Sequence, residues 1–188
     1  MKYLLSAIFL SLAVSLTHAR NIIERYQAEI RSPQTCGDPT DALPFYRLYD
    51  PTIIDHVYTT NLAVVNADVP SHTFQGVAAL VFGTQEESTV PFYRLVNRAA
   101  AVNFYTISET ERADALQNGY TAPPNNPVTY IYPTQICGSV PFYRLYDEVN
   151  TDNFYTTSES ERLEFIANGY TDIEIAGYVL PVTSTQCA

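Results

Sequence analysis

The chain has 188 residues, with 20 acidic side chains against ten lysines and arginines, and a formal net charge of −10. Such an acidic surface repels phosphate groups, which argues against nucleic acids and anionic membranes as partners. Tyrosine is the compositional outlier, with 15 copies against no tryptophan and one methionine.

Residues 1–19 have the pattern of a signal peptide. Lys2 precedes an apolar run from Leu4 to Leu16 that is too short to span a bilayer, and small residues at Thr17 and Ala19 mark a cleavage site. The sequence therefore predicts a secreted, extracellular protein with no membrane insertion. Because Lys2 is the only charged residue of this segment, its removal would change the formal net charge from −10 to −11.

An N-terminal extension, residues 20–43, comes next. Its stretch from Ile22 to Ile30 fits either a strand or a helix. Residues 44–188 are then expected to form one domain of three repeats, because the phrase Pro-Phe-Tyr-Arg-Leu begins three times. We call these repeats the first copy (44–90), the second copy (91–140) and the third copy (141–188).

The third copy has the clearest local signals. Its segments Phe142 to Tyr146 and Asn153 to Thr157 predict a β-hairpin around a polar turn. The sequence Ser158-Glu159-Ser160-Glu161 matches a capping box, and Asn-Gly follows as a helix stop, so a helix over 159–167 is expected. Two more short strands are expected at Tyr170-Thr171 and from Ala176 to Leu180.

The other two copies repeat this plan to different degrees. The second copy keeps the capping box at Ser108, the Asn-Gly stop at Gly119, and a closing strand from Val128 to Tyr132. The first copy has lost the capping box and the stop, so no helix is expected there. It keeps a closing strand from Gly76 to Phe82.

No single unit of this size can bury its apolar face alone, whereas three units around an axis can. The predicted fold is therefore all-β with short helices, in a three-fold pseudo-symmetric closed repeat. A β-trefoil-like closure is the preferred model, and a three-bladed propeller-like closure is the alternative.

The repeat consensus, roughly P-x-Y-R-x-Y, F-Y-T-T, S-x-x-E-R, N-G-Y and G-Y-V, resembles a secreted tandem-repeat family long known without a function. Members occur alone in fungi and attached to extracellular hydrolases in bacteria, and the resemblance covers about 44–181. It implies an extracellular, carbohydrate-associated, lectin-like binding module. Family members often carry an Asp-His pair before F-Y-T, which this chain keeps only at Asp55-His56.

Three cysteines are present, and in an oxidising compartment disulfides are expected. A bridge between Cys36 and Cys187 would tie the two ends of a closed ring. Cys137 is the alternative partner of Cys36, and the odd count leaves one thiol over.

The candidate ligand-binding residues come from the hairpins and their loops. The arginines fit either internal ion pairs or donors to sugar hydroxyls, the loop acids and amides fit either Asx turns or hydroxyl acceptors, and each tyrosine fits either the core or a sugar-stacking face. The candidates are Arg47, Asp50, Asp55, His56, Tyr58, Arg94, Asn97, Asn103, Tyr105, Arg144, Asp147, Asp152, Asn153 and Tyr155.

Catalysis has little support in the sequence. Glu111 and Glu161 each have an acidic neighbour, as a glycosidase requires, but both occupy the third helical position of a capping box, which explains them locally. No nucleophile motif is found, and no cofactor or metal site is predicted. A calcium site at Asp147, Asn150 and Asp152 has no recognised spacing.

The function expected from these features is multivalent, lectin-like recognition of neutral glycans or glycoproteins, with one sugar for each functional copy and no enzymatic activity. The first alternative is a secreted protein-binding or inhibitory module. A glycoside hydrolase is the second alternative.

Overall fold

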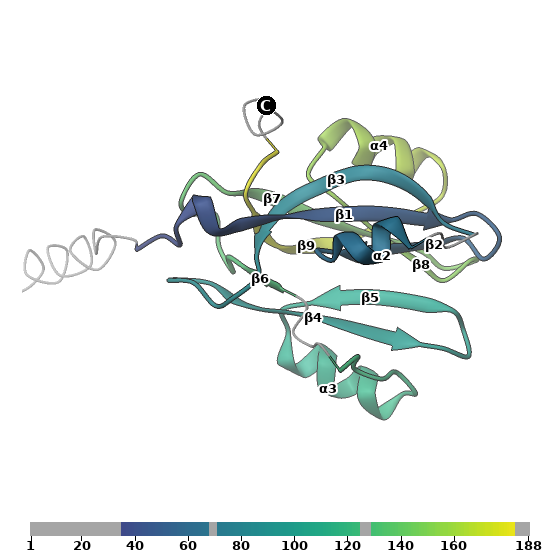
Figure 1. The fold of residues 1–188 in the computed structure, drawn as a ribbon. Helices are drawn as coiled ribbons and strands as arrows, with labels where there is room; N and C mark the ends of the chain where they lie inside the picture. The colour runs from purple at the N-terminus through teal and green to yellow at the C-terminus, as the bar shows by residue number, and fades with distance from the viewer. Residues whose placement is uncertain (1–34, 68–70, 125–128, 183–188) are drawn as a thin grey trace, which may run out of the picture. The chain divides into compact units, whose positions relative to one another are not determined.

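The structure is a computed structural model that describes residues 35–67, 71–124 and 129–182. The chain divides into two units, residues 1–34 and 35–188, and only the second contains described residues. The predicted signal peptide and the segment Ile22 to Ile30 therefore lie outside the described residues. In the second unit strands predominate and the helices are short, as an all-β fold requires (Figure 1).

Each copy contributes a two-stranded hairpin, a helix and one further strand. The first copy contains β1 (Ala42–Asp50), β2 (Asp55–Thr59), α2 (Leu62–Asn66) and β3 (Thr73–Phe82), after a 3-10 turn, η1 (Pro39–Asp41). The second copy contains β4 (Val90–Asn97), β5 (Val102–Thr106), α3 (Glu109–Gln117) and β6 (Thr129–Ile131). The third copy contains β7 (Val140–Asp147), β8 (Asp152–Thr156), α4 (Glu159–Ala167) and β9 (Thr171–Val179).

The three predicted hairpins are confirmed, and they share one register. The arginine of the first strand lies opposite the tyrosine of the second strand in each: Arg47 opposite Tyr58, Arg94 opposite Tyr105 and Arg144 opposite Tyr155. The further strand of each copy pairs with the other edge of the hairpin, so that β1, β4 and β7 are central strands.

The strands form a six-stranded sheet, in the order β2-β1-β3-β6-β4-β5, and a three-stranded sheet, in the order β8-β7-β9. Single bridges connect the outer strands of different copies: Phe82 with Tyr130, Tyr132 with Tyr178, and Leu80 with Leu180. Within the described ranges the strands do not close into a barrel.

A ring of tyrosine hydrogen bonds connects β2, β5 and β8. The Tyr105 hydroxyl accepts from the Tyr58 backbone N–H and donates to the Tyr58 carbonyl, both at 2.8 Å. The Tyr155 hydroxyl makes the same two bonds to the backbone of Tyr105, and the Tyr58 hydroxyl makes them to Tyr155. Each hydroxyl therefore satisfies two buried backbone groups on a strand edge that has no neighbouring strand.

Three phenylalanines pack beside this ring and complete an aromatic core. Phe45, Phe92 and Phe142 are fully buried, and their ring centroids lie 6.3–6.4 Å apart at tilted or edge-on angles that aromatic pairs favour. The repeated Pro-Phe-Tyr-Arg-Leu phrase thus brings one phenylalanine from each copy into a single hydrophobic cluster.

The helix in the third copy agrees with the prediction, since α4 spans Glu159–Ala167 and the Ser158 hydroxyl accepts from the Glu161 N–H at 3.2 Å. The other half of the expected capping box is wrong. The Ser158 N–H donates to Thr156 Oγ1 at 3.0 Å, and the Glu161 carboxylate contacts Arg47 of the first copy instead. A residue assigned to local capping therefore connects two copies.

Two further details differ from the sequence prediction. The first copy does form a short helix, α2, because Asn61 replaces the lost serine as N-cap and accepts from the Ala63 N–H at 2.9 Å. The third copy has one continuous strand, β9, where two short strands were expected. Register shifts in its pairing with β7 let it continue past the irregular section.

The disulfide joins Cys36 to Cys137, so the expected Cys36–Cys187 bridge is wrong and the alternative pairing is correct. A hydrogen bond joins the same two segments of the chain, because the Tyr132 hydroxyl accepts from the Gly37 N–H at 3.1 Å. Gly37 directly follows Cys36, and Tyr132 comes shortly before Cys137. The disulfide therefore attaches the segment before β1 to the loop that precedes the third copy. Cys187 lies outside the described residues.

Candidate functional site

The copies meet at three junctions with corresponding residues. Each junction combines an arginine from a central strand, the third residue of the helix in the preceding copy, and a polar residue near the start of a hairpin's second strand. The third–first junction has Arg47, Glu161 and His56; the first–second junction has Arg94, Val64 and Asn103; the second–third junction has Arg144, Glu111 and Asn153. The differences among the junctions decide where a ligand has room.

The third–first junction is filled by its own side chains. Arg47 forms a two-pronged ion pair with Glu161 at 2.6 and 3.0 Å. The His56 Nδ1 lies 2.6 Å from Asp152 Oδ2, and both residues are buried. Phe165 of α4 stacks on Phe154 with a centroid separation of 3.5 Å.

The electrostatics of this junction are those of a structural contact. Burial by itself would raise the pKa of Glu161, but hydrogen bonds from Arg47 and Thr156 lower it below the ordinary value. Burial and the neighbouring carboxylate of Asp152 raise the pKa of Tyr170, whose hydroxyl donates to Asp152 Oδ2 at 2.7 Å. Arg47 therefore binds Glu161, and His56 binds Asp152, so these three predicted ligand-binding residues all have protein partners at this junction.

The second–third junction contains a pocket with a volume of about 290 Å³. Arg144 lines it, and its Nε donates to Asn153 Oδ1 at 3.0 Å while Nη1 donates to Glu111 at 2.6 Å and to Glu174 at 3.2 Å. Burial lowers the pKa of Arg144, but Tyr155 and Glu111 outweigh that effect and raise it, so the guanidinium stays charged.

The walls of this pocket carry aromatic rings and further polar groups. The Arg144 guanidinium lies over Phe104, 5.0 Å from the ring centroid, and Phe104 meets Tyr120 edge to face at 5.2 Å. The exposed side chains of Asp114 in α3 and of Asn118, the C-cap residue of that helix, line the same pocket. Its remaining lining residues are Glu111, Ala115, Tyr146, Asn153 and Ile173. The pocket thus combines aromatic faces with hydrogen-bond donors and acceptors.

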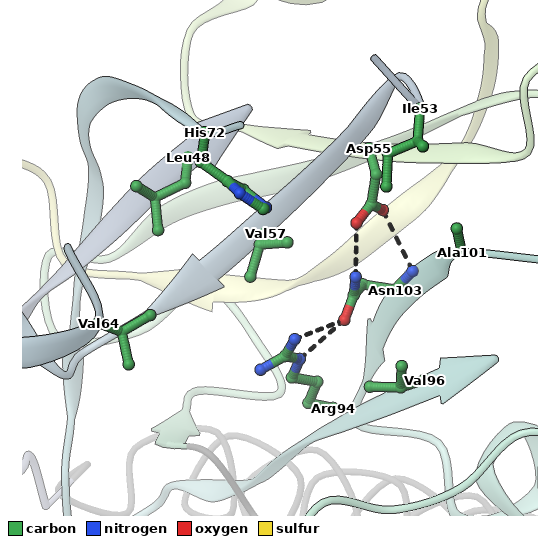
Figure 2. Close-up of a pocket in the computed structure, with 10 residues that line it drawn as sticks. All are labelled: Leu48, Ile53, Asp55, Val57, Val64, His72, Arg94, Val96, Ala101 and Asn103. Atoms are coloured by element: carbon green, nitrogen blue, oxygen red, sulfur yellow. Dashed lines mark hydrogen bonds between the residues drawn. The ribbon is translucent and has the colours of Figure 1, made fainter. Parts of the chain in front are cut away.

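The first–second junction also contains a pocket, of about 340 Å³ (Figure 2). Figure 2 shows three polar side chains joined in one chain of hydrogen bonds. Arg94 donates from Nε and Nη2 to Asn103 Oδ1 at 2.9 and 2.7 Å, and Asn103 Nδ2 donates to Asp55 Oδ2 at 2.6 Å. The helix position that holds glutamate at the other two junctions is Val64 here.

Asp55 supplies the carboxyl group among the lining residues of this pocket. It is 3% exposed, and burial raises its pKa to about 7 although hydrogen bonds from Asn103 oppose the change. The Asp152 carboxylate raises the pKa further, and the Arg94 guanidinium lowers it. The group therefore changes its protonation state near neutral pH.

The loop residues among the candidates satisfy their own turns. Asp50 accepts from the backbone and hydroxyl of Thr52, Asn97 accepts from the N–H groups of Ala99 and Ala100, and Asp147 accepts from the N–H groups of its own loop. These are the Asx-turn contacts that the sequence allowed as the alternative to ligand binding.

The three hairpin tyrosines are the largest correction to the predicted site. Tyr58, Tyr105 and Tyr155 are fully buried in the aromatic core, so none of them offers a face to a ligand. Of the predicted residues, Asp55, Arg94 and Asn103 meet at one pocket, and Arg144 and Asn153 meet at the other.

Several pocket residues were missed by sequence reasoning. Tyr120, Tyr146 and Asp114 lie in different elements, and no short motif joins them. A usable signal did exist at the helix position occupied by Glu111, because glutamate recurs there in the third copy and is replaced by Val64 in the first. A partly buried charge that recurs between copies points to a contact between them rather than to a local cap.

Within the three described ranges, no group of three or more histidine, cysteine, aspartate or glutamate side chains has the geometry to hold a metal ion. The helices in these ranges are also too short or too polar to cross a membrane.

Comparison with known proteins gives one family. The family model described as "Domain of unknown function (DUF5648)" matches residues 18–129 and, in a second overlapping match, residues 44–180. Neither a curated protein nor a solved structure matches the chain. Because the two matches together span most of the sequence and include all three junctions, the chain belongs to this family of unknown function.

Proposed function

We propose that this protein is a secreted, lectin-like protein that binds neutral glycans in the pocket of the second–third junction. The observation that carries the proposal is the composition of that pocket. It places the rings of Tyr120 and Tyr146 beside Arg144, Asp114 and Asn118. A sugar has apolar C–H faces and a rim of hydroxyls, and this set of side chains complements both.

Recognition follows from the side chains at the pocket wall. A tyrosine ring packs against the apolar face of the sugar, while the carboxylates of Glu111 and Asp114 accept from its hydroxyls. Arg144 is already held by Glu111, Glu174 and Asn153. Its orientation is therefore set before a ligand arrives, which lowers the entropy cost of binding.

We also infer that the three copies close around one axis, in a propeller-like rather than a trefoil-like arrangement. The cyclic tyrosine hydrogen bonds between β2, β5 and β8 support this inference, as do the bridges that connect β3, β6 and β9 in pairs. Equivalent positions in the fold do not imply equivalent sites. Of the two junction pockets described above, the one at the second–third junction has aromatic walls, so the proposal replaces three sugars for each chain with one.

Secretion is part of the proposal. The apolar segment after Lys2 supports it, and so does the disulfide between Cys36 and Cys137, a bond that persists in oxidising compartments.

The test is a broad glycan array probed with the chain secreted from a eukaryotic host, followed by calorimetric titration of any hit. Asp114→Ala is expected to weaken binding at least about tenfold, equivalent to about 1.4 kcal/mol. Glu164 occupies the same position in α4 but lies outside the pocket, so Glu164→Ala is the matched control and is expected to bind as the unmodified chain does.

The outcome also separates the alternatives. Release of reducing sugar from a bound glycan would favour a glycoside hydrolase. A silent array would favour a protein-binding module, for which β9 offers a specific surface: Ile173 and Ile175 are 46% and 44% exposed on one face of the strand. Equal binding by the two variants would refute the proposed sugar pocket.

A further inference from the structure

One helix position differs in a way that bears on the pocket of the second–third junction. In α4 this position is Phe165, whose ring stacks on Phe154 with a centroid separation of 3.5 Å and an interplanar angle of 7°. In α3 the same position is Ala115, which carries no ring and lines the pocket. One junction therefore contains an aromatic ring of the protein at this helix position, whereas the other has a pocket beside it.

The surroundings of this position are alike at the two junctions. Phe104 corresponds to Phe154, and an arginine of the next copy lies over each ring, 5.0 Å and 4.9 Å from the ring centroid. Tyr120 corresponds to Tyr170, and each meets its phenylalanine at a steep angle, with centroids 5.2 Å apart in the second copy and 6.4 Å apart in the third. The tyrosine thus lies closer where the helix ring is missing. Such partial relaxation is what a smaller side chain normally produces, and it leaves a cavity.

The pocket has a buried apolar end and an exposed polar rim. Phe104 and Ala115 are 4% and 8% exposed, whereas Asp114 and Asn118 are exposed side chains. Nε and Nη1 of Arg144 already donate to side chains of the protein. A sugar hydroxyl at the apolar end would lose its water without gaining a partner, which costs free energy. A phenyl ring has no such group to desolvate.

From these contacts we propose that the buried end of this pocket is a subsite for a planar aromatic ring, so that the preferred ligand is a glycoside whose sugar is attached to an aromatic group. The ligand's ring lies against Ala115, in the position that corresponds to Phe165 of the third copy. The sugar lies at the rim beside Asp114 and Asn118. This inference rests on the proposed function, because it uses the same pocket, and it adds the chemical class of the group to which the sugar is attached.

The size and the charge of the pocket narrow the class of aromatic group. A volume of about 290 Å³ is at the lower end of the range for small-molecule sites, and suits one ring with its adjacent sugar better than a long oligosaccharide. Glu111 and Asp114 line the pocket, and Glu174 contacts the same arginine as Glu111 does. Three carboxylates around one guanidinium disfavour an acidic ring such as a benzoate. The expected aromatic group is therefore uncharged.

The first experiment titrates the secreted chain calorimetrically with phenyl, cyclohexyl and methyl β-glycosides of glucose, galactose, mannose and N-acetylglucosamine. For a sugar that binds, the phenyl glycoside is expected to bind at least about tenfold more tightly than the methyl glycoside, because the ring buries additional apolar surface. The cyclohexyl glycoside has the same number of carbon atoms but is not planar, so it is expected to bind more weakly than the phenyl glycoside.

The outcomes separate this inference from the proposed function. Binding of a methyl glycoside with no gain from the phenyl group would overturn the aromatic subsite and leave the sugar pocket intact. Equal or tighter binding of the cyclohexyl glycoside would also overturn the subsite, since hydrophobic burial without stacking would then be enough. If none of the glycosides binds, the inference fails together with the sugar pocket on which it rests.

The second experiment exchanges residues between the copies. Ala115→Phe introduces the side chain of the third copy, and is expected to bring the affinities for the phenyl and methyl glycosides within about twofold of each other. The matched control is Leu116→Ile, which introduces the third copy's residue at the next position, exposed and outside the pocket. It is expected to keep the full preference for the phenyl glycoside. A preference that persists in Ala115→Phe would overturn the inference.

A measurement on the unmodified chain keeps the inference testable if Ala115→Phe disturbs folding. In saturation-transfer difference NMR with the phenyl glycoside, protons at the buried end of the pocket receive more saturation from the protein than protons at the rim. The phenyl protons are therefore expected to show stronger saturation than the sugar protons. Stronger saturation of the sugar protons would place the sugar at the buried end and overturn the inference.

Discussion

The tyrosine ring predicts a large loss of stability from the removal of one oxygen atom. In Tyr105→Phe the ring remains, but the backbone N–H and carbonyl of Tyr58 lose their partner in a core where the residue is fully buried. An unsatisfied buried donor or acceptor costs about 1–3 kcal/mol, so two such groups cost about 2–6 kcal/mol. This is a large fraction of the about 5–15 kcal/mol that stabilises an ordinary domain.

Urea unfolding followed by far-ultraviolet circular dichroism measures this loss. Because each hydroxyl makes the same pair of bonds, Tyr58→Phe and Tyr155→Phe are expected to cost as much as Tyr105→Phe. Tyr46→Phe is the control, since its ring packs against Phe74 and no hydrogen bond of its hydroxyl occurs within the described residues; it is expected to change stability by less than about 0.5 kcal/mol. A cost below about 1 kcal/mol in the three ring variants would refute the reasoning.

Three other predictions follow from the junctions and the disulfide. Cys137→Ser opens a loop of 101 residues and is expected to cost about 4–5 kcal/mol in urea unfolding; an unchanged midpoint would contradict the bridge. Glu161→Gln leaves the guanidinium of Arg47, which is 12% exposed, without its carboxylate and is expected to lower the free energy of unfolding by about 1–3 kcal/mol. The control Glu159→Gln, on the exposed helix face, should lower it by under about 0.5 kcal/mol. Equal losses would argue against a partly buried ion pair between Arg47 and Glu161. The pKa of Asp55 is raised to about 7 in the folded state, so protonated Asp55 stabilises the fold at low pH, and this stabilisation is lost as the pH rises from about 4 to 7. The urea midpoint should therefore fall less between pH 5 and pH 8 in Asp55→Asn than in the unmodified chain. Parallel curves of midpoint against pH would refute this prediction.

The local elements of the fold could be predicted because their causes lie close together in the sequence. The alternation of Phe142, Arg144 and Tyr146 around a polar turn is enough to indicate a hairpin, and Ser158 with Gly169 is enough to bound a helix. The repeat of these signals also predicted three similar units. The first copy was the exception, because Asn61 is a weaker sequence signal than a full capping box.

The candidate site could be predicted only in part. The sequence named three residues that do line a pocket: Asp55, Arg94 and Asn103. It also named Tyr58, Tyr105 and Tyr155, which are fully buried. Their residue type and regular spacing would be the same if they bound a ligand. Whether a tyrosine faces a ligand or the core depends on what packs against it. In this chain the packing partners come from other copies, 47 or more residues away.

The sequence by itself determined the hairpins, two of the three helices and the division into three copies, since hydrogen bonds and capping between near neighbours produce them. Only the tertiary structure decided which copies leave a pocket between them. At one junction Glu161 binds Arg47, and Phe165 stacks on Phe154 nearby, whereas at another junction Val64 and Arg94 both line a pocket. The physical reason is that a pocket depends on the volumes and charges of side chains that meet only when distant copies pack together.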